Sequence, residues 1–397
     1  MTTTAEETIT AHLTRGFDDV AGLRDEWESL PSEALTADFD YFHTVLASEP
    51  SMLEPAVLTV ARDGRTEAMV IARFERVPLS FKLGYKRIYE PVVRALTVIY
   101  RGFRGELDAV TSSLVVRELT NVLGEGEVEV VVFRRLDTQH PLYPAATTEP
   151  RLLVRQLYTR VGVCRERSLP DSFAAFMESL SKSTRTGVTR YAKKLEREFG
   201  DRLELRRFVD PGELDTYLAH ADAVAARSYQ RGLGVGVRDE PAQRLRAQLS
   251  MERGWFRAYV LYVDGSPVAF CGGDAYAGRL YYGIPGYDPA YGEYRVGTYV
   301  LMKMIEDLCE DDRVHVLDFG PGEAEYKRRF GDRSWHEADV YLFAARPRPL
   351  FVNVARAAIL GTSDGLASAA RTAGVVGRVK RRWRDRATTR QIRVRSS

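Results

Sequence analysis

Only three cysteines occur in this chain of 397 residues, Cys164, Cys271 and Cys309. Their odd number and wide spacing fit neither a disulfide framework nor a zinc knuckle, and they favour a reducing compartment. The six histidines are scattered and no H-E-x-x-H motif is present, so no metal site is predicted.

Long apolar runs are missing as well. No stretch approaches the ~20 apolar residues that a membrane-spanning helix needs. The first residues, MTTTAEETITAHLTRG, include Glu6 and Glu7 and lack the apolar core of a secretory signal. We therefore expect a cytoplasmic protein.

Charge is unevenly distributed, although the net charge is only +2. Residues 367–397 contain ten Lys and Arg against one acid, Asp385, so this tail carries +9 and the rest of the chain −7. We expect the tail to be helical or disordered. It could contact an anionic membrane at its inner face or bind nucleic acid without specificity, and the sequence does not choose between these roles.

Two stretches of the chain look alike. Residues 56–74 (AVLTVARDGRTEAMVIARF) and 256–275 (FRAYVLYVDGSPVAFCGGDA) each place Asp-Gly between two apolar runs. This pattern predicts a β-hairpin, because glycine supplies the positive φ that the turn requires. Helical patterning precedes both hairpins, so we interpret the chain as a tandem repeat of one α/β fold.

The second half alternates strands and helices, and its order predicts a mixed α/β sheet. We expect strands at 203–209, 279–284, 314–320 and 337–345 besides the hairpin, and helices at 211–230, 240–253, 296–311 and 322–330. The predicted domains are 1–160, 161–345 with a basic linker helix at 171–200, and a tail at 346–397.

Two motifs point to a family. "GYDPAYGEYRVGTY" (286–299) precedes a helix, and "LDFGPGEAEYKRRFG" (317–331) follows it. Their order and spacing resemble the GNAT N-acyltransferase superfamily, in the branch related to FemAB peptidyltransferases and CelD-type acetyltransferases. The resemblance covers residues 168–345 well, and residues 1–150 only as a weaker first copy. The first copy has no counterpart of the DFGPGEAEYK segment, so we expect it to be structural or to shape the acceptor site.

The resemblance implies a binding site for acyl-CoA at the start of the helix near residue 297, in a cleft where the strand before residue 286 splays from residues 314–318. Unpaired N–H groups and the helix dipole favour a pyrophosphate there. The predicted binding residues are Arg295, Val296, Gly297 and Thr298. The family's R/Q-x-x-G-x-G/A loop is incomplete in this chain, so aminoacyl-tRNA stays open as the donor, and Gly297 could merely begin a helix.

Four residues after that helix are predicted to act in catalysis. By the resemblance, Tyr326 is a general acid that protonates the departing thiolate, and Lys327 stabilises an oxyanion or a phosphate. Asp318 and Glu323 are candidates to remove a proton from the amine acceptor. The alternatives are an aromatic that packs on a strand for Tyr326, an exposed helix lysine for Lys327 and a helix cap for Glu323.

Substrate contacts are expected from Tyr282, Tyr287 and Asp274, because rings with hydroxyl groups suit a sugar or another polar acceptor. Asp274 is also a possible base. The basic segment 182–197 could meet a nucleotide-linked substrate or tRNA, although a solvated helix face is the commoner reason for such charge.

The sequence therefore predicts an acyl-CoA-dependent N-acyltransferase, most simply an N-acetyltransferase that uses acetyl-CoA and no metal. An amino sugar or another exopolysaccharide or cell-envelope precursor is the acceptor that the resemblance suggests, and no specific nucleic acid is predicted as a partner. Two alternatives stay open: a FemAB-like aminoacyl-tRNA-dependent peptidyltransferase, and a membrane-associated assembly factor without catalytic activity.

Overall fold

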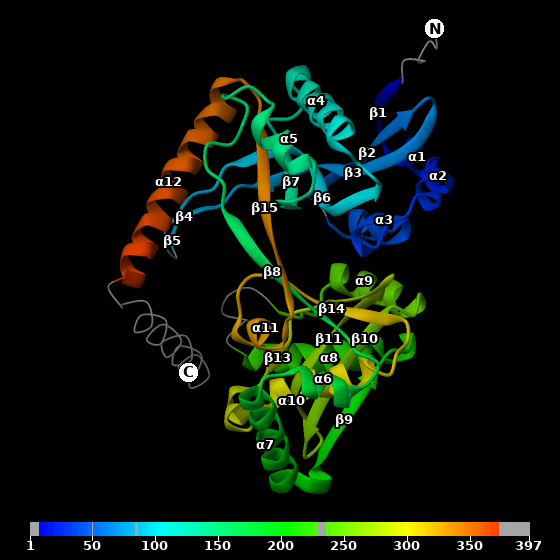
Figure 1. Cartoon of the computed structure of the whole chain (residues 1–397), viewed down its shortest axis with the longest axis vertical. Coiled ribbons are helices and arrows are strands. Elements are labelled where there is room, and N and C mark those ends of the chain that lie inside the picture. The colour runs from blue at the N-terminus through cyan, green and yellow to red at the C-terminus, as the bar shows by residue number, and fades with distance from the viewer. Residues whose placement is uncertain (1–7, 50, 84–85, 229–235, 373–397) are drawn as a thin grey trace. The chain divides into compact units, whose positions relative to one another are not determined.

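The computed structural model in Figure 1 describes residues 8–49, 51–83, 86–228 and 236–372. The chain forms two compact units. Among the described residues, the first unit comprises those within 8–163 and 335–372, and the second those within 164–334. The predicted α/β fold class is confirmed. None of the helices in the described part of the chain combines the length and the hydrophobicity of a membrane-spanning segment.

The first unit is a mixed sheet with the strand order β1-β2-β3-β6-β7-β15. Its strands are β1 (Ile9–Arg15), β2 (Met52–Arg62), β3 (Arg65–Pro78), β6 (Val92–Gly105), β7 (Val130–Asp137) and β15 (Arg333–Phe343). A small separate hairpin consists of β4 (Phe81–Leu83) and β5 (Lys86–Tyr89). The helices are α1 (Phe17–Ala21), α2 (Arg24–Ser29), η1 (Leu35–Ala37), α3 (Phe39–Ser48), α4 (Ala109–Glu125), α5 (Leu142–Thr148) and α12 (Pro347–Thr372).

Helices cover both faces of this first sheet. Leu119 of α4 and Leu142 of α5 belong to the core on one face. On the other face, Trp27 of α2 and Phe42 of α3 pack against strands β2 and β3, and Val352 of α12 packs against β6, β7 and β15. All five side chains are almost completely buried, so this unit has its own hydrophobic core.

The second unit has the strand order β8-β14-β12-β11-β10-β9, and β13 pairs with β11. Its strands are β8 (Val161–Ser168), which leads into it from the first unit, β9 (Leu203–Phe208), β10 (Phe256–Val263), β11 (Ser266–Tyr276), β12 (Gly278–Tyr282), β13 (Gly286–Tyr287) and β14 (Val314–Pro321). The helices are α6 (Phe173–Ser179), α7 (Lys182–Phe199), η2 (Gly200–Arg202), η3 (Pro211–Glu213), α8 (Leu214–Arg227), α9 (Pro241–Glu252), η5 (Pro289–Tyr294), α10 (Val296–Leu308) and α11 (Glu325–Phe330).

The two faces of the second sheet carry different helices. Met304 and Ile305 of α10 pack on the face that also receives Leu195 of α7. Leu218 of α8 and Met251 of α9 pack on the opposite face. This separation places the start of α10 and the α8–α9 pair on opposite sides of one sheet.

Both predicted hairpins are present. Arg62 pairs with Arg65 in the first and Val263 with Ser266 in the second, so each loop consists of Asp-Gly alone. All four turn residues have positive φ, from 51° to 79°, as a tight two-residue hairpin requires. The linker helix predicted at 171–200 is two helices, because α6 ends before Leu180 and Ser181 caps the start of α7. Its predicted end is confirmed, since α7 ends at Phe199 and Gly200 has φ +47°.

The domain boundaries differ from those expected from the sequence. The strand predicted at 337–345 is β15, and its residues Glu337–Phe343 pair with β7 of the first unit rather than complete the second. The segment assigned to a tail from residue 346 begins with α12, in which Val352, Asn353 and Arg356 are buried. The remaining tail prediction falls on residues 373–397, which lie outside the described residues.

Candidate functional site

The start of α10 is set by an unusual backbone conformation. Arg295, which connects η5 to α10, has φ 56° and ψ 39°. Its carbonyl accepts hydrogen bonds from the amides of Thr298 (2.9 Å) and Tyr299 (3.1 Å). The amides of Val296 and Gly297 belong to the first turn, where a helix offers no acceptor of its own. The helix therefore presents two backbone donors and the positive end of its dipole at this point.

The four predicted binding residues contribute to this helix start in different ways. The side chain of Val296 is completely buried in the core, so only its amide can meet a ligand. Gly297 faces the Tyr287 ring, and a Cβ there would lie 3.4 Å from the nearest ring atom, an ordinary contact distance. Arg295 is exposed and Thr298 is half-buried.

The basic helix α7 packs beside this helix start. The Lys194 ammonium lies 2.7 Å from the Glu293 carboxylate, and the Tyr299 hydroxyl donates to Glu196 at 3.3 Å. The Arg295 guanidinium lies 5.7 Å from the centre of the Tyr191 ring. Hydrogen bonds from Arg190 and then from Arg295 lower the pKa of Tyr191.

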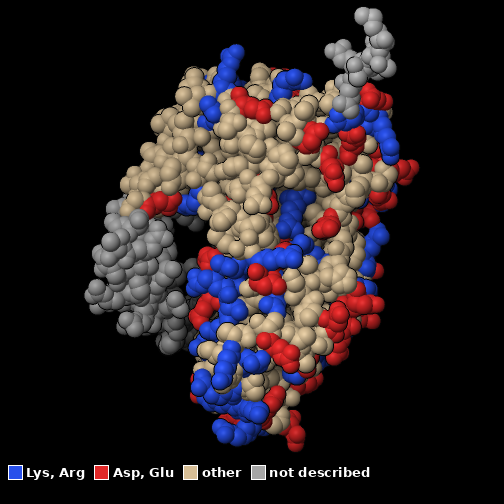
Figure 2. Space-filling model, viewed as in Figure 1, with Lys and Arg blue, Asp and Glu red and all other residues tan. Residues whose placement is uncertain are grey.

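Figure 2 shows Lys and Arg side chains gathered over α7. The helix contributes six of them: Lys182, Arg185, Arg190, Lys193, Lys194 and Arg197. The basic segment is thus both a solvated face and a neighbour of the α10 start.

Strands β12 and β14 are paired where the sequence predicted a splay. They run in parallel from Gly278 to Tyr281, which pairs with Asp318. Beyond Tyr281 the chain leaves β14 but stays beside β11: the Gly283 amide donates to the carbonyl of Gly272 at 2.8 Å, and β13 then pairs with β11. The strands therefore separate only after residue 318, and the predicted separation over 314–318 is wrong.

Tyr326 lies among aromatic rings. Its ring centre is 5.8 Å from that of Phe319 and 6.2 Å from that of Tyr282, each in an edge-on arrangement. Tyr282 is buried, and burial raises its pKa well above the ordinary tyrosine value, so it stays neutral. The structure brings Tyr282 and Tyr326 together, as the predicted site requires, and the role of Tyr326 as a general acid stays a prediction.

Lys327 is not an exposed helix lysine. Its side chain is buried, and Nζ donates to the carbonyl oxygens of Gly320 (3.2 Å) and Pro321 (2.5 Å). These carbonyls belong to the Gly-Pro-Gly turn, in which Gly320 and Gly322 have φ of 66° and 84°. The ammonium therefore holds this turn against α11.

Asp318 is buried and engaged within the sheet. Its Oδ1 accepts from the Gly320 amide at 2.8 Å, and its Oδ2 lies 3.7 Å from the Arg279 guanidinium. Arg279 also contacts Glu166 of β8 at 2.6 Å. Asp318 thus belongs to a charge cluster that joins β8, β12 and β14.

Glu323 does not cap α11. The N-cap position is Ala324, which makes no side-chain capping bond. The Glu323 carboxylate instead lies 3.1 Å from both Arg165 and Arg328. The interpretation as a helix cap is wrong, and as a base Glu323 would have to act between two guanidinium groups.

Asp274 occupies a different environment. It lies on β11, on the face that α8 and α9 cover, in register with Phe256 of β10 and Tyr281 of β12. Its carboxylate accepts a hydrogen bond from the buried hydroxyl of Ser250 on α9. Burial raises its pKa to about 6, although Ser250 and Arg246 oppose the rise.

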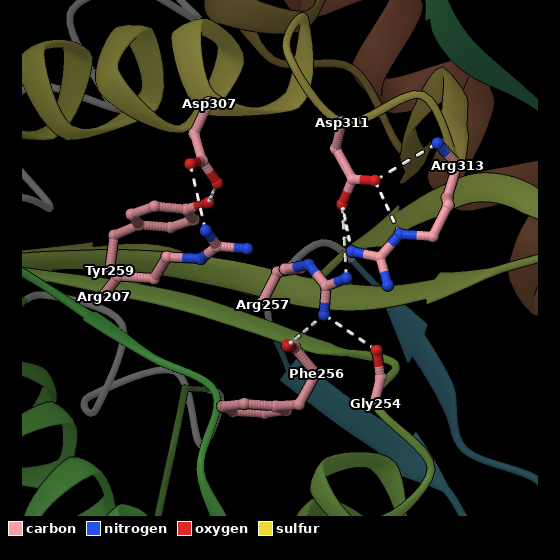
Figure 3. Close-up of polar contacts among 8 residues, drawn as sticks. All are labelled: Arg207, Gly254, Phe256, Arg257, Tyr259, Asp307, Asp311 and Arg313. Atoms are coloured by element: carbon pink, nitrogen blue, oxygen red, sulfur yellow. Dashed lines mark hydrogen bonds and ion pairs between the residues drawn. The ribbon is translucent and has the colours of Figure 1, made fainter.

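The sequence reasoning missed a polar cluster at the other end of α10, drawn in Figure 3. Arg257 of β10 donates to the carbonyls of Gly254 and Phe256 and lies 3.2 Å from Asp311. Asp311 also binds Arg313 at 2.8 Å. The arginine inside the otherwise apolar strand FRAYVLYV could have predicted this cluster, because a buried charge requires a partner.

A second group in Figure 3 ties α10 to the strands. Asp307 of α10 accepts hydrogen bonds from Arg207 of β9 and from the Tyr259 hydroxyl of β10. Burial raises the pKa of Tyr259, and the neighbouring Asp307 raises it further. Because these acids and arginines pair with one another, we assign the cluster to fold stability and not to ligand binding.

Residues 182–328 match a protein family described as "Acetyltransferase (GNAT) domain". This range runs from α7 to the middle of α11. It contains the motif at 286–299 and all but the last three residues of the motif at 317–331. No curated protein matches the chain.

Among solved structures, FemX is similar in fold, with a TM-score of 0.54, 9% identity, and coverage of 83% of this chain and 98% of FemX. A protein of unknown function from Bacteroides thetaiotaomicron has a TM-score of 0.49, 11% identity, and coverage of 81% and 97%. A tandem GNAT protein from the clavulanic acid biosynthesis pathway has a TM-score of 0.48, 9% identity, and coverage of 86% and 100%. At these identities the FemX likeness concerns the fold alone.

Proposed function

Because residues 182–328 form a domain of the GNAT superfamily, we propose that the protein is an N-acyltransferase that uses an acyl-CoA, in its simplest form acetyl-CoA, to acylate an amine. The observation that carries the proposal is the start of α10. Two first-turn amides and the exposed Arg295 meet there, beside the basic helix α7. Such a helix start binds phosphate groups through its N–H donors and its dipole.

The residues present fit a pyrophosphate. The amides of Val296 and Gly297 would donate to its oxygens, and the lack of a side chain at Gly297 lets a ligand approach the backbone. Arg295 would add a charge-assisted contact, and Arg190 lies on the same Tyr191 ring at 4.8 Å. An acyl-CoA supplies an activated thioester, while the residues of this chain bind, orient and move protons.

Tyr326 is the proposed proton donor to the departing thiolate. Its ring is held by Phe319 and Tyr282, which limits the directions that its hydroxyl can take. Tyr287, more than a third exposed beside Gly297, offers a ring face to a polar substrate. The narrower form of the proposal is an amino sugar of an exopolysaccharide or cell-envelope precursor as acceptor.

Isothermal titration with acetyl-CoA and free CoA tests the donor. We expect the wild-type chain to bind both and Gly297→Ala to bind at least ~10-fold more weakly, because the added methyl group obstructs the phosphate contact, whose loss costs more than ~1.4 kcal/mol. Gly292→Ala is the matched control. It lies in the preceding η5, and its Cβ would meet nothing closer than 4.0 Å.

Absence of binding to every CoA compound would overturn the proposal. Tight binding of aminoacyl-tRNA that weakens steeply with salt, without CoA binding, would replace it by a FemAB-like transfer from tRNA. Assays with glucosamine and with simple primary amines then separate the amino-sugar form of the proposal from a broader acceptor range.

A further inference from the structure

One of the two carboxylate oxygens of Asp274, in the second unit, has no hydrogen-bond partner among the described residues. This oxygen, Oδ1, is shielded from solvent. The carboxylate accepts a hydrogen bond from the hydroxyl group of Ser250. Buried polar atoms are normally satisfied, so an unpaired carboxylate oxygen calls for an explanation.

The strand β11 is built to hold this residue against its neighbours. A Cβ at Gly273 would lie 2.1 Å from the carbonyl oxygen of Tyr281, and one at Gly272 would lie 2.5 Å from that of Arg257. Only glycine permits these close approaches on both sides of β11. The position of Asp274 relative to β10 and β12 is therefore fixed by backbone contacts directly before it.

Register places Asp274 next to the point where the sheet opens. Asp274 pairs with Tyr281, and Tyr281 pairs with Asp318 on β14. Tyr281 is the last residue of β12 that pairs with β14 before the two strands separate. Directly paired residues project from the same face of a sheet, so Asp274, Tyr281 and Asp318 form a row across three strands.

This row lies on the face opposite to α10. Leu280, Leu317 and Cys271 belong to the core beneath α10, and they alternate with the residues of the row. Phe270, on the same side of β11 as Asp274, belongs to the core beneath α8 and α9. A donor bound at the start of α10 and an acceptor that meets Asp274 would thus approach the open point from opposite faces.

The groups around Asp274 favour a carboxylate that exchanges its proton near neutral pH. Tyr217 of α8 and Phe256 of β10 supply an aromatic environment, Tyr281 lies beside it on β12, and Ser250 and Arg246 approach from α9. Desolvation disfavours the charged form, while the Ser250 hydroxyl and the Arg246 charge favour it. The resulting pKa of about 6 lies within the range suited to a general base.

The other acids of the predicted site are occupied. Asp318 binds the Gly320 amide and lies beside Arg279, and Glu323 lies between two arginines. Both carboxylates therefore already have partners within the fold, whereas the Oδ1 atom of Asp274 has none among the described residues.

We propose that Asp274 accepts the proton of the ammonium form of the amine substrate, that Ser250 is its positioning residue, and that the acceptor reaches the site from the α8–α9 face of the sheet. This inference rests on the proposed function. An N–H bond of the ammonium breaks, its proton bonds to Oδ1, and the nitrogen keeps the electron pair with which it attacks the thioester carbonyl. The carboxylic acid then returns its proton to solvent, so no further reactant is needed.

The test measures thiol release from acetyl-CoA with a panel of primary amines that includes glucosamine, from about pH 5 to about pH 9, together with acetyl-CoA affinity. The variants are Asp274→Asn, Ser250→Ala and the control Asp215→Asn, which removes a carboxylate from the exposed surface of α8. We expect Asp274→Asn to lose ~10²–10⁴-fold in kcat and to keep its acetyl-CoA affinity. Ser250→Ala should move the acidic limb of the pH profile to higher pH, because it removes a hydrogen bond that stabilises the carboxylate.

The outcomes separate the inference from the proposed function. Wild-type transfer together with an Asp274→Asn variant that keeps kcat within about threefold would overturn the inference alone. An unshifted acidic limb in Ser250→Ala would remove Ser250 as a positioning residue. If Asp274→Asn does not fold, the same unshifted limb would overturn the assignment of Asp274 as the base. A wild-type chain that neither binds acetyl-CoA nor acylates any amine would overturn both.

Discussion

The Nζ atom of Lys327 lies 2.5 Å from the carbonyl oxygen of Pro321. A lysine that a family resemblance placed at the reacting carbonyl is thus engaged by the turn that precedes it. Two backbone carbonyls accept from this ammonium, and the side chain is buried. The two neighbouring residues therefore have different surroundings: Lys327 binds the Gly-Pro-Gly turn, and Tyr326 packs against the aromatic rings of Phe319 and Tyr282.

Replacing Lys327 with methionine tests this difference. The variant keeps most of the length of the side chain but loses two charge-assisted hydrogen bonds and leaves two carbonyl groups without their partner. We expect the free energy of unfolding to fall by ~2–4 kcal/mol, measured by urea denaturation, with acetyl-CoA affinity retained. Arg328→Met, which removes an exposed ion pair with Glu323, should cost less than ~1 kcal/mol. Equal midpoints for the two variants would contradict the structural role of Lys327.

Asp311 should make stability depend on pH in the acid range. Hydrogen bonds, first from Arg313 and then from Arg257, hold its pKa well below the ordinary value of 3.8. A depressed folded-state pKa contributes stability above the unfolded value, and this stability is lost as the pH falls through the folded value. Asp311→Asn should therefore be less stable than wild type at neutral pH, by ~3–5 kcal/mol since it leaves Arg257 without its partner charge.

The measurement is a series of urea unfolding curves between about pH 2 and about pH 7. The difference in the free energy of unfolding between wild type and Asp311→Asn should become smaller as the pH falls below about 4. A difference that stays constant over this range would mean that Asp311 does not titrate in the way its contacts imply.

Asp274 should act on stability in the opposite direction. Burial raises its pKa to about 6 from the ordinary 3.8, and a raised folded-state pKa stabilises the protein at low pH. That contribution is lost as the pH rises from about 4 through about 6, with an upper value on the order of 3 kcal/mol. Relative to Asp274→Asn, the wild-type chain should therefore lose stability between about pH 4 and about pH 6. Parallel stability curves for the two proteins would show that the carboxylate is not perturbed.

Two glycines of the second unit should respond oppositely to alanine. Gly187 lies inside α7, and apart from its chain neighbours and the backbone of its own helix nothing lies within 4 Å of the position that an added methyl group would take. Gly187→Ala should therefore stabilise the protein by ~0.5–1 kcal/mol. At Gly273 the methyl group would collide with the Tyr281 backbone, so Gly273→Ala should destabilise it by several times that amount, at least ~2 kcal/mol. Thermal denaturation of both variants checks the pair. Similar melting temperatures would show that β11 and β12 can separate at little cost.

Local sequence decided most of the order of elements in the second unit. Asp-Gly at 264–265 strongly favours a two-residue turn. Gly200 ends α7 because glycine accepts a positive φ. The GNAT motifs lie on α10, β14 and α11 as the resemblance implied. These features depend on residues close in the chain, so a pattern along the sequence is sufficient to predict them.

Tertiary structure decided what the side chains at the site do. The surroundings of Asp274 depend on Ser250 from a separate helix, and Glu323 finds Arg165 on a strand that precedes the whole domain match. Strand β15 pairs with β7, which lies far earlier in the chain, and therefore belongs to the first unit. Desolvation and ion pairing arise from neighbours brought together by packing, and periodicity in the sequence carries no information about which distant side chains will meet.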